Sequence, residues 1–520
     1  MQIGRNRRYA VQGNNVGMSA YGGRLSRRNA CVLIAGVSAL AIVAPAEAWA
    51  QGAEAPRFGA PEPFSREQLV GRARTLAARP YQPRPAAEDV AQSYDAAGKL
   101  AYGEAERIAE FVRLLPVSSL AAAPVVIHVV EGGTARTVQS FAGLFSGGTT
   151  HPAGFRIMAP DLRSDWLSYQ GASYFRASGS QEQYGLSARG VAVDTALPRP
   201  EEFPSFTEFW IERKSASRFI IHALLDGPSL TGAFTFDSSK GAEGTTQDVT
   251  ATLFLRKDIE RLGIAPATSM FWYGEGQRPL ATDWRPEVHD SDGLALWSGT
   301  GERIWRPLYN PAGARTAAFA ATDPKGFGLI QRDRDFADYQ DDGVWYDRRP
   351  NLWVEPQGAW GKGAVMLYEM PTDSETADNI VAFWLSDKPA RKGERRDLRY
   401  RLHWTSRDLS AGTAAHATNI WIGASSLPGG RARTGAKKFV IDFEGPVLQG
   451  LDRNSGVQPV VDLPTDALFE ISAYPVLGTA ARWRVVVDTK VEQGARKEFR
   501  LFLRRGDNAL SETVIQPLEP

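Results

Sequence analysis

The pattern that most constrains the fold of this chain is a two-residue alternation of apolar and other side chains in short runs. Residues 249–255 read Val-Thr-Ala-Thr-Leu-Phe-Leu, and similar alternations fill 398–404, 439–443 and 499–503. Successive side chains of a strand point to opposite faces, so this period indicates strands with one buried face. Glycine and proline, 50 and 32 residues of the chain, interrupt the runs at short intervals. These features predict an all-β fold built from sandwiches or barrels.

Length and one charged segment predict two domains. A chain of 520 residues exceeds the size that one hydrophobic core usually serves. Residues 387–397 are charged, contain Pro389 and Gly393, and lack apolar periodicity, which is typical of a linker. We therefore expect a large N-terminal β-sandwich over 51–386. A smaller domain over 398–520 has the length and the short strands of an immunoglobulin-like sandwich.

Two helices are expected near the start of the first domain. Ser65 and Gln68 form a capping-box pattern ahead of an apolar helix face that includes Leu69 and Leu76. This helix should end before Pro80. A second helical stretch is expected at 87–100.

The first 50 residues have the features of a twin-arginine export signal. Arg27 and Arg28 follow a long polar segment, an apolar run covers 30–45, and Ala-Trp-Ala at 48–50 matches a small-x-small cleavage site. A general secretory signal with incidental arginines is the alternative. Cys31, the single cysteine, lies inside this segment, so we expect no disulfide and no cysteine-bound metal in the mature chain. The expected location is the periplasm.

The charge balance gives no support for a nucleic-acid partner. The formal net charge is +1, and it becomes −4 without the six Arg and one Glu of the first 50 residues. A near-neutral chain without a basic run suits an uncharged ligand better. His-Asp-Ser-Asp at 289–292 could suggest a metal, but a metal needs three or four converging ligands and the chain has six histidines in all. We expect neither a metal nor a cofactor, and the oligomeric state stays open.

Tryptophan is concentrated in one part of the chain. Seven of the 14 tryptophans lie between residues 272 and 360, interleaved with acidic side chains. Aromatic rings can stack on sugar rings and carboxyl groups can move protons, so a site for a neutral polysaccharide is one interpretation. The alternative is that these rings fill a β core. Trp345, Tyr346, Trp353 and Trp360 lie in Gly-, Pro- and Asp-rich stretches, and we expect them to form sugar platforms on loops at the sandwich rim.

Several longer motifs resemble one known family. They are Gly-Ala-Ser-Tyr-Phe-Arg at 171–176, Tyr-Gly-Leu-Ser-Ala-Arg-Gly at 184–190, Asp-Pro-Lys-Gly-Phe-Gly at 323–328, Trp-Gly-Lys-Gly at 360–363 and Asp-Asn-Ile-Val at 378–381. Together they resemble the periplasmic glucan biosynthesis proteins G and D, the Opg or Mdo family, from about residue 64 to 513. The twin-arginine pattern, with 289–292 and 339–341, favours the D branch.

The resemblance implies both a fold and an activity. The N-terminal sandwich would be similar to the sugar-binding domain of galactose mutarotase, and an immunoglobulin-like domain would follow. Members of the family resemble inverting endo-β-1,2-glucanases that act on osmoregulated periplasmic glucans. The family's acid position falls on Asp378 and its base position on Asp290, and Tyr346 and Glu375 fall where the family lines its cleft. The implied partners are β-1,2-linked glucan and the inner-membrane glucan synthesis machinery.

Alternatives stay open at several of these positions. Asp290 and Asp378 are 88 residues apart, so only the fold could bring them together. Asp292 could replace Asp290 as the base, and we expect Asp292 and Tyr339 among the substrate-binding residues. Arg332 could clamp sugar hydroxyls or form an ion pair with neighbouring aspartates. The alternative function is a non-catalytic glucan-binding or assembly factor in the same pathway.

Overall fold

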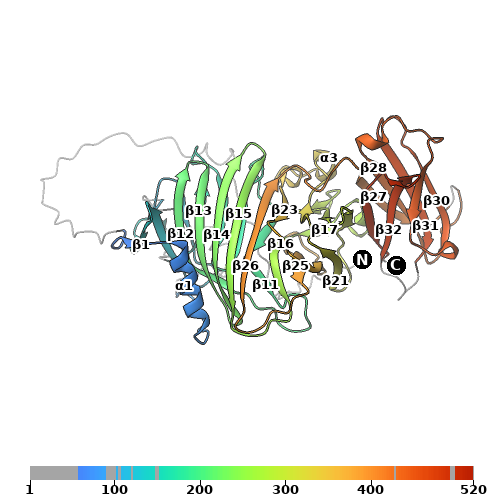
Figure 1. The fold of residues 1–520 in the computed structure, drawn as a ribbon. Helices are drawn as coiled ribbons and strands as arrows, with labels where there is room; N and C mark the ends of the chain where they lie inside the picture. Colours follow the sequence, from blue (N-terminus) through green and yellow to red (C-terminus); the bar gives the residue numbers. More distant parts are fainter. Residues whose placement is uncertain are drawn as a thin grey trace, which may run out of the picture.

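The computed structural model describes residues 57–88, 101–102, 107–118, 121–146, 151–426, 429–491 and 498–518. The expected export signal and almost all of the helix expected at 87–100 lie outside these residues. Within the described ranges, no helix is long and apolar enough to span a membrane. Figure 1 shows a large β-sandwich followed by a smaller one that contains the C-terminal strands.

One layer of the large sandwich is a sheet that continues into the smaller sandwich. Its strands in spatial order are β1 (Glu62–Pro63), β5 (Thr134–Thr137), β4 (Val126–Glu131), β12 (Ser205–Ser215), β13 (Arg218–Asp226), β14 (Leu230–Gly241), β15 (Gly244–Leu255), β26 (Arg395–Thr405), β23 (Asn351–Pro356), β22 (Gly326–Ile330), β19 (Gly293–Trp297), β20 (Arg303–Pro307), β34 (Thr513–Pro517), β32 (Glu498–Arg505) and β29 (Val457–Val461). β33 (Asn508–Ala509) pairs with β32. The pairs β4·β12 and β20·β34 are parallel, and the others are antiparallel.

The second layer of the large sandwich is an antiparallel sheet. Its strands in spatial order are β21 (Arg315–Thr322), β24 (Lys362–Glu369), β25 (Ile380–Ser386), β16 (Leu262–Ser269), β10 (Ser187–Arg189), β9 (Tyr174–Ala177), β8 (Asp165–Gln170), β7 (Pro152–Met158) and β3 (Val112–Pro116), with β11 (Val191–Val193) also paired to β16. Two small ribbons accompany it: β17 (Phe271–Tyr273) with β18 (Val288–His289), and β2 (Ala101–Tyr102) with β6 (Phe145–Ser146).

The main core lies between these two layers. Val249 and Leu253, inward residues of the alternation at 249–255, are at most 2% exposed. Aromatic rings from the two layers interlock, because Tyr169 of β8 packs edge-on against Phe209 of β12 and Phe236 of β14, with ring centres 5.9 and 5.2 Å apart. Burial of such rings supplies most of the driving force for folding.

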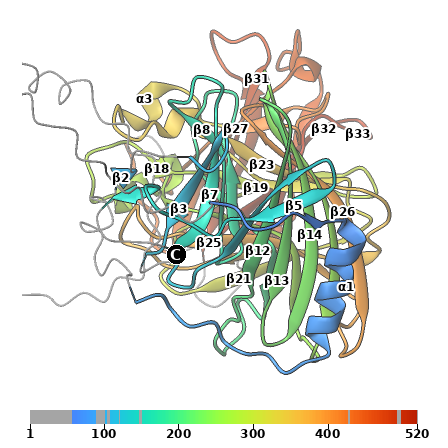
Figure 2. The same cartoon turned by 90° about the vertical axis from the view of Figure 1, so that its left-hand side faces the viewer.

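Helix α1 (Arg66–Ala77) lies against the outer face of the large sheet (Figure 2). It begins at the predicted capping box, in which Ser65 and Gln68 bond each other's backbone N–H groups. Leu69 and Ala73 are fully buried in an apolar cluster that includes Trp210 of β12. The predicted helix start is therefore confirmed, and its apolar face covers the sheet.

The smaller sandwich also has two layers. β27 (His416–Ala424), β28 (Ala436–Glu444), β31 (Arg482–Lys490) and β30 (Leu468–Pro475) form one layer, which faces β29, β32 and β34. Short 3-10 turns, η3 (Pro446–Leu448) and η4 (Thr465–Ala467), connect strands of this unit. Phe439, Phe443, Trp483 and Leu501 are at most 1% exposed in its core. The all-β prediction of two sandwiches is thereby confirmed.

The boundary between the sandwiches differs from the expected one. β26 pairs with β15 on one side and β23 on the other, so residues expected to end a linker and open the second domain belong to the large sandwich. Tyr400 and Leu402 of β26 point into the core, while Arg401 pairs with Asp248 across the outer face at 2.7 Å. Charges on the outer face of this strand produced the linker-like composition. The chain leaves the large sandwich after Thr405.

Candidate active site

Two segments far apart in sequence meet at β17. Phe271 of β17 pairs with His289 of β18. The side chain of Asn379 accepts from the Phe271 N–H at 2.8 Å and donates to its carbonyl at 2.9 Å. Asp290 follows His289, and Asp378 precedes Asn379. This clamp brings the loop before β25 to the end of β18, where the two predicted catalytic carboxylates lie.

Asp378 has the protonation behaviour of an acid catalyst. It is half-buried immediately ahead of β25. Burial, followed by the negative charge of Asp290, raises the pKa of Asp378 from 3.8 to about 6, although Arg189 and Arg176 oppose the rise. A carboxyl group that still holds a proton near neutral pH can donate it to a leaving oxygen. The influence of Asp290 on this pKa means that the two groups lie within electrostatic reach of each other.

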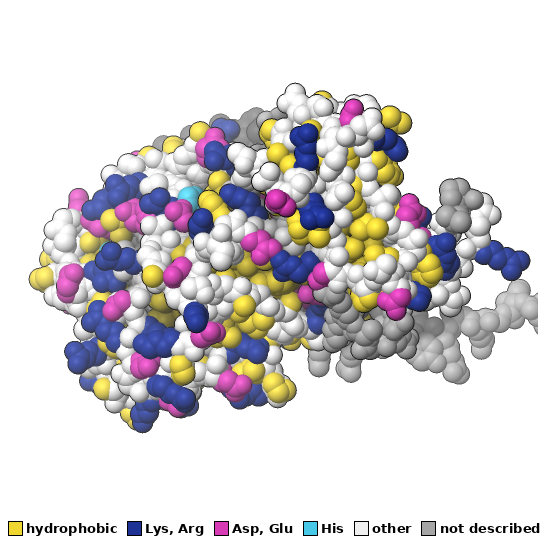
Figure 3. Space-filling view, turned by 45° about the vertical axis from the view of Figure 1, so that its right-hand side comes forward, with side chains coloured by type: hydrophobic (Ala, Val, Ile, Leu, Met, Phe, Trp, Pro, Cys, Tyr) yellow, Lys and Arg dark blue, Asp and Glu magenta, His cyan; other side chains and the backbone are white. Residues whose placement is uncertain are grey.

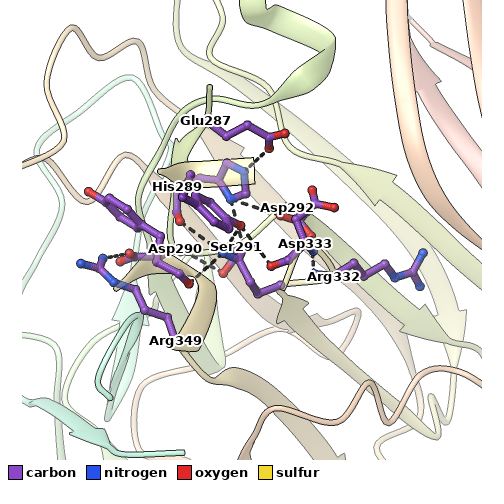
Figure 4. Close-up of polar contacts among 12 residues, drawn as sticks. Glu287, His289, Asp290, Ser291, Asp292, Arg332, Asp333 and Arg349 are labelled. Atoms are coloured by element: carbon purple, nitrogen blue, oxygen red, sulfur yellow. Dashed lines mark hydrogen bonds and ion pairs between the residues drawn. The ribbon is translucent and has the colours of Figure 1, made fainter. Parts of the chain in front are cut away.

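Asp290 is held in place by an arginine. The aspartate is 5% exposed, and one of its carboxylate oxygens forms an ion pair with Arg349 (Figure 4). The guanidinium carbon of Arg349 lies 4.0 Å from the ring centre of Tyr346. The backbone N–H of Asp290 donates to the Met270 carbonyl at 2.8 Å. Both the backbone and the carboxylate of Asp290 are therefore fixed beside Tyr346.

Tyr346 and Glu375 lie together, as the resemblance implies. The Tyr346 hydroxyl donates to Glu375 Oε2 at 2.7 Å, and Arg285 Nη1 lies 2.8 Å from the same oxygen. Burial raises the pKa of Tyr346 well above its usual value, and the charges of Asp290 and Glu375 add to the rise. Arg285 is itself fixed by Asp341 at 2.6 Å. Glu375 is 37% exposed, so this chain of contacts leads from Asp290 to the surface.

Two tryptophans flank this group. Trp345, at the start of the 3-10 turn η2 (Tyr346–Arg348), is half-buried and has a backbone φ of 57°, a left-handed value that bulky residues rarely adopt. The guanidinium of Arg348 covers its ring at 4.1 Å. Trp284, the neighbour of Arg285, is 72% exposed. Trp284 was not among the expected site residues, although it belongs to the tryptophan-rich region. Strained backbone and exposed large rings are both features of ligand sites.

Trp353 is a core residue, and Trp360, in the loop before β24, is half-buried against the core, which corrects the expectation that both are sugar platforms at the rim. Trp353 belongs to β23, is 4% exposed and packs in the core cluster shared by the two sandwiches. Gly326 makes room for it, because a Cβ there would lie 2.2 Å from the indole. Trp360 packs against Trp384 and Tyr400, with ring centres 5.9 and 6.2 Å apart. For these two rings, the core alternative describes the structure.

Arg332 joins the two sandwiches. Two of its nitrogens bind Glu512 of the smaller sandwich at 2.6 and 3.0 Å, and its Nε donates to Asp408 at 3.0 Å. Its guanidinium also covers the ring of Trp305 at 3.6 Å. With a further bond from Nη1 to the Ala417 carbonyl at 2.9 Å, these contacts use four of the five N–H donors of Arg332. The ion pair was anticipated, but with neighbouring aspartates rather than with these partners.

Tyr339 lies behind the site. It ends the short helix α3 (Phe336–Tyr339) and is fully buried. Its ring stacks on Tyr346 with centres 5.8 Å apart, and its hydroxyl donates to the Asp333 carbonyl at 3.2 Å. Tyr339 therefore supports Tyr346 from within, and its expected contact with substrate is not what the structure shows.

Asp292 also differs from its expected role. It lies 3.1 Å from His289 Nδ1 and accepts from the backbone N–H of Asp333 at 3.0 Å. Figure 4 shows Asp290 and Asp292 on opposite sides of Ser291. Among the charges that act on the pKa of Asp378, that of Asp290 has the largest effect. The structure thus favours Asp290 between the two candidates for the base.

A group of possible metal ligands lies beside Asp292. Atoms of Glu287, His289 and Asp333 lie within 4.8 Å of one another. His289 Nε2 is already 2.8 Å from Glu287 Oε2. Burial would lower the pKa of His289, but the charges of Asp292 and Glu287 outweigh it and raise this pKa to about 9. Its two ring nitrogens already lie against Glu287, Asp292 and Gln331, so an ion bound here would have to displace these contacts.

The comparison with protein families agrees with this architecture. The family described as "Periplasmic glucan biosynthesis protein, MdoG" matches residues 64–517. "Glucans biosynthesis protein D 2" of Ralstonia nicotianae is 42% identical over 500 residues, which cover 89% of this chain and 92% of the relative. "Glucans biosynthesis protein D" of Stenotrophomonas maltophilia is 38% identical over 490 residues, covering 89% and 91%. The protein of the same name in Pseudomonas fluorescens is 40% identical over 522 residues, covering 93% and 95%.

Among solved structures, a galactose mutarotase related enzyme from Lactobacillus acidophilus covers 54% of this chain and 98% of its own, with 8% identity and a TM-score of 0.22. That likeness is too distant to bear on activity. The molecule is a two-sandwich β protein in which carboxylates and aromatic rings converge on the larger unit. It belongs to the periplasmic glucan biosynthesis protein family, as its motifs predicted.

Proposed function

We propose that this protein is an inverting endo-β-1,2-glucanase that acts on the backbone of periplasmic glucans, with Asp378 as general acid and Asp290 as general base. The observation that carries the proposal is the pair itself. Asp378 has a pKa raised to about 6, and part of the rise comes from Asp290. A carboxyl group that keeps its proton near neutral pH, with a second carboxyl group nearby, is the apparatus of inverting glycoside hydrolysis.

The proposed reaction follows from these two environments. Protonated Asp378 donates its proton to the departing glycosidic oxygen. Asp290, fixed by Arg349, accepts a proton from the water that attacks the opposite face of the sugar. Attack from the opposite face inverts the anomeric centre. Tyr346 and Glu375 extend from Asp290 toward the surface, where hydroxyl groups of the substrate can exchange hydrogen bonds with them.

The exposed aromatic rings supply the binding surface. In this proposal the exposed Trp284 and the half-buried Trp345 stack on the glucose rings on either side of the cleaved bond. Tyr346, expected as a third platform, is 2% exposed with Tyr339 and Arg349 against its ring, so it contributes its hydroxyl instead. A neutral polymer agrees with the mixture of acidic and basic side chains on the face shown in Figure 3. We place the protein in the periplasm after twin-arginine export, with β-1,2-linked glucan as ligand and the inner-membrane glucan synthesis machinery as a partner.

One observation favours a second candidate function, a glucan-binding or assembly factor without hydrolysis. Asp290 is buried and one of its oxygens is engaged by Arg349. A carboxylate in that state is well placed to accept hydrogen bonds from a bound sugar. A general base would have to leave its ion pair with Arg349 to take a proton from water. A residue that only binds sugar can keep that ion pair, and the glucan is then held without being cleaved.

Incubation with linear β-1,2-glucan separates the two functions. The hydrolase should release short oligosaccharides with inverted anomeric configuration, detected by chromatography and NMR. Asp378→Asn should reduce release by at least about 1,000-fold, because general acid catalysis and the charge pair are both lost. Asp373→Asn, on the exposed part of the same loop, is the matched control and should retain activity. Undiminished cleavage by Asp378→Asn would refute the assignment, and binding without any product would support the second function.

A further inference from the structure

The outer face of the smaller sandwich carries exposed aromatic side chains that the proposed reaction does not use. In β28, Phe439 and Ile441 point into the core, so Val440 between them points outward. Trp421 of β27 is the direct neighbour of Val440 in the sheet and therefore also points outward. It is 37% exposed. A single exposed indole is ordinary on a protein surface, but a group of aromatic side chains on one face is a feature of interaction sites.

An arginine guanidinium lies against one side of each of three aromatic rings on this face. Arg484 lies 5.1 Å from the ring centre of Trp421. Two further pairs are Tyr474 with Arg453 at 5.2 Å, and Phe469 with Arg433 at 4.5 Å. Phe469 is 44% exposed, and Tyr474 is half-buried. The three pairs lie on β27, β31 and β30 and on the segments next to them, shown at the right of Figure 1.

Two of the three arginines, Arg484 and Arg433, are fixed by ion pairs that balance their charge. Arg484 binds both oxygens of the buried Asp442 at 2.7 and 3.0 Å. Arg433 Nη1 lies 3.1 Å from Asp488 Oδ2. Pre-organised guanidinium and carboxylate groups present donors and acceptors in a fixed plane without a large net charge. That combination suits a ligand with many hydroxyl groups and no charge better than an anionic polymer.

We propose that this aromatic–arginine face is a second glucan-binding surface, which holds the polymer outside the catalytic cleft. The inference rests on the proposed glucan substrate. Flat rings offer stacking platforms for pyranose rings, and the adjacent ion pairs offer hydrogen bonds to hydroxyls. The strands of Trp421 and Tyr474 are three sheet spacings apart, about 14 Å, so the face fits several linked sugar rings rather than one.

The position of the face relative to the cleft supports a polymer as its occupant. Ile420, the residue before Trp421, donates its N–H to Glu275 Oε1 at 2.7 Å. Glu275 begins the 3-10 turn η1 (Glu275–Leu280), and the loop after η1 carries Trp284 and Arg285 of the site. The strand that carries Trp421 is therefore in contact with the segment that leads to Trp284 and Arg285, and a long polymer is the kind of ligand that can reach from this face to the site.

The test uses the full-length protein with Asp378→Asn, so that binding is measured without cleavage. Titration calorimetry compares long linear β-1,2-glucan with an oligosaccharide only long enough for the cleft. Adding Trp421→Ala and Tyr474→Ala should weaken binding of the long polymer about tenfold and leave binding of the oligosaccharide unchanged. Leu477→Ala, 97% exposed in the turn between β30 and β31, is the control and should change neither affinity.

The outcomes separate this inference from the proposed function. Equal affinity of the parent and the double variant for the long polymer would overturn the second surface while the cleft still binds. Loss of oligosaccharide binding in the double variant would also overturn it, because the face would not be independent. If the parent bound neither ligand, the glucan substrate itself would be wrong. A variant with Trp421→Phe instead of Trp421→Ala should keep most of the affinity for the long polymer. If the alanine variants bound weakly only because the domain had unfolded, the aromatic replacement would not be expected to recover binding.

Discussion

The protonation state of Asp378 controls the proposed reaction at the scale of single residues. Its carboxyl group has to be protonated to act as the acid, and its pKa is raised to about 6. The rate on β-1,2-glucan should therefore fall as pH rises above about 6, by about tenfold per pH unit. A pH profile of initial rates measures this limb. A rate that rises between pH 6 and pH 8 would contradict the role of Asp378.

Replacing Arg189 should shift the pH at which the rate begins to fall, in a direction that follows from its charge. Its positive charge lowers the pKa of Asp378, and Glu201 holds it at 2.7 Å. Arg189→Gln removes the charge, so the pKa of Asp378 should rise and the descending limb should shift to higher pH. Arg199→Gln, an exposed arginine of the same region, should leave the limb in place. A merely structural role of Arg189 would lower the rate without moving the limb.

Asp378 should also lower the free energy of unfolding at neutral pH. Its pKa is 3.8 in the unfolded chain and about 6 in the folded one. The folded state therefore binds the proton more tightly, and stability falls as pH rises from about 4 to about 6 and stays lower above that. Asp378→Asn should stabilise the protein by up to about 2 kcal/mol at pH 7 and by little at pH 4. Urea unfolding at both pH values measures the difference, and a less stable variant at pH 7 would contradict the prediction.

The sequence identified the two carboxylates through the resemblance and not through their spacing. Asp290 and Asp378 are acidic residues among 59 in the chain, and nothing local marks them as a pair. Arg349, which fixes Asp290, had no signal at all in the sequence. Arg332 was misread because its partners, Glu512 and Asp408, lie in distant segments. Long-range electrostatic partners depend on the fold, which residue types alone do not reveal.

At the scale of elements, the site depends on how β25 is tied to β17. Asn379 makes three hydrogen bonds, two with the Phe271 backbone and one with the Met370 carbonyl. Asn379→Ala should lower stability by about 2–3 kcal/mol, since buried backbone groups lose their partners. Activity should fall at least about tenfold, because Asp378 would no longer be held beside Asp290.

A matched substitution distinguishes the clamp from a packing effect. Asn379→Asp keeps the size of the side chain and its acceptor for the Phe271 N–H, but loses both donated hydrogen bonds. Because its carboxylate would face the carbonyl oxygens of Phe271 and Met370, its stability and activity should be no higher than those of Asn379→Ala, although it fills the same space. Thermal unfolding and initial rates report the two properties. Equal activity of Asn379→Ala and the parent would show that the clamp does not position the acid.

The elements were predicted best where one face of a strand is buried. The alternation at 249–255 and the capping box at Ser65 both correspond to observed elements. β26 was placed partly in a linker because its exposed face is charged and Pro389 and Gly393 precede it. Trp353 was expected in a loop because glycine and proline surround it. The glycine at 326 instead creates the space that its indole fills.

At the scale of the whole molecule, the two sandwiches are coupled by a shared sheet and by Arg332. Removing its guanidinium leaves Glu512 and Asp408 without their partner in a buried place. Arg332→Met should therefore destabilise the protein by about 3–5 kcal/mol. Denaturant unfolding followed by tryptophan fluorescence and by circular dichroism measures the loss, and the parent should unfold in one transition by both signals.

An exposed ion pair provides the control for this prediction. Arg395 and Asp397 are 55% and 59% exposed, so Arg395→Met should cost less than about 1 kcal/mol. If Arg332→Met were no more destabilising than Arg395→Met, the junction would not be held by this network. The coupling itself could not be predicted from the sequence, because β20 and β34 pair across almost the whole second half of the chain.

The pairing of β20 with β34 has a consequence for synthesis. β20 receives its second neighbour only when the ribosome has made residues 513–517, after every other strand. Until then β20 is an edge strand with one side unpaired, and its free backbone N–H and C=O groups can pair with another nascent chain and cause aggregation. A premature stop codon upstream of this strand should therefore yield an insoluble product retained by chaperones, and not a shortened protein with partial activity.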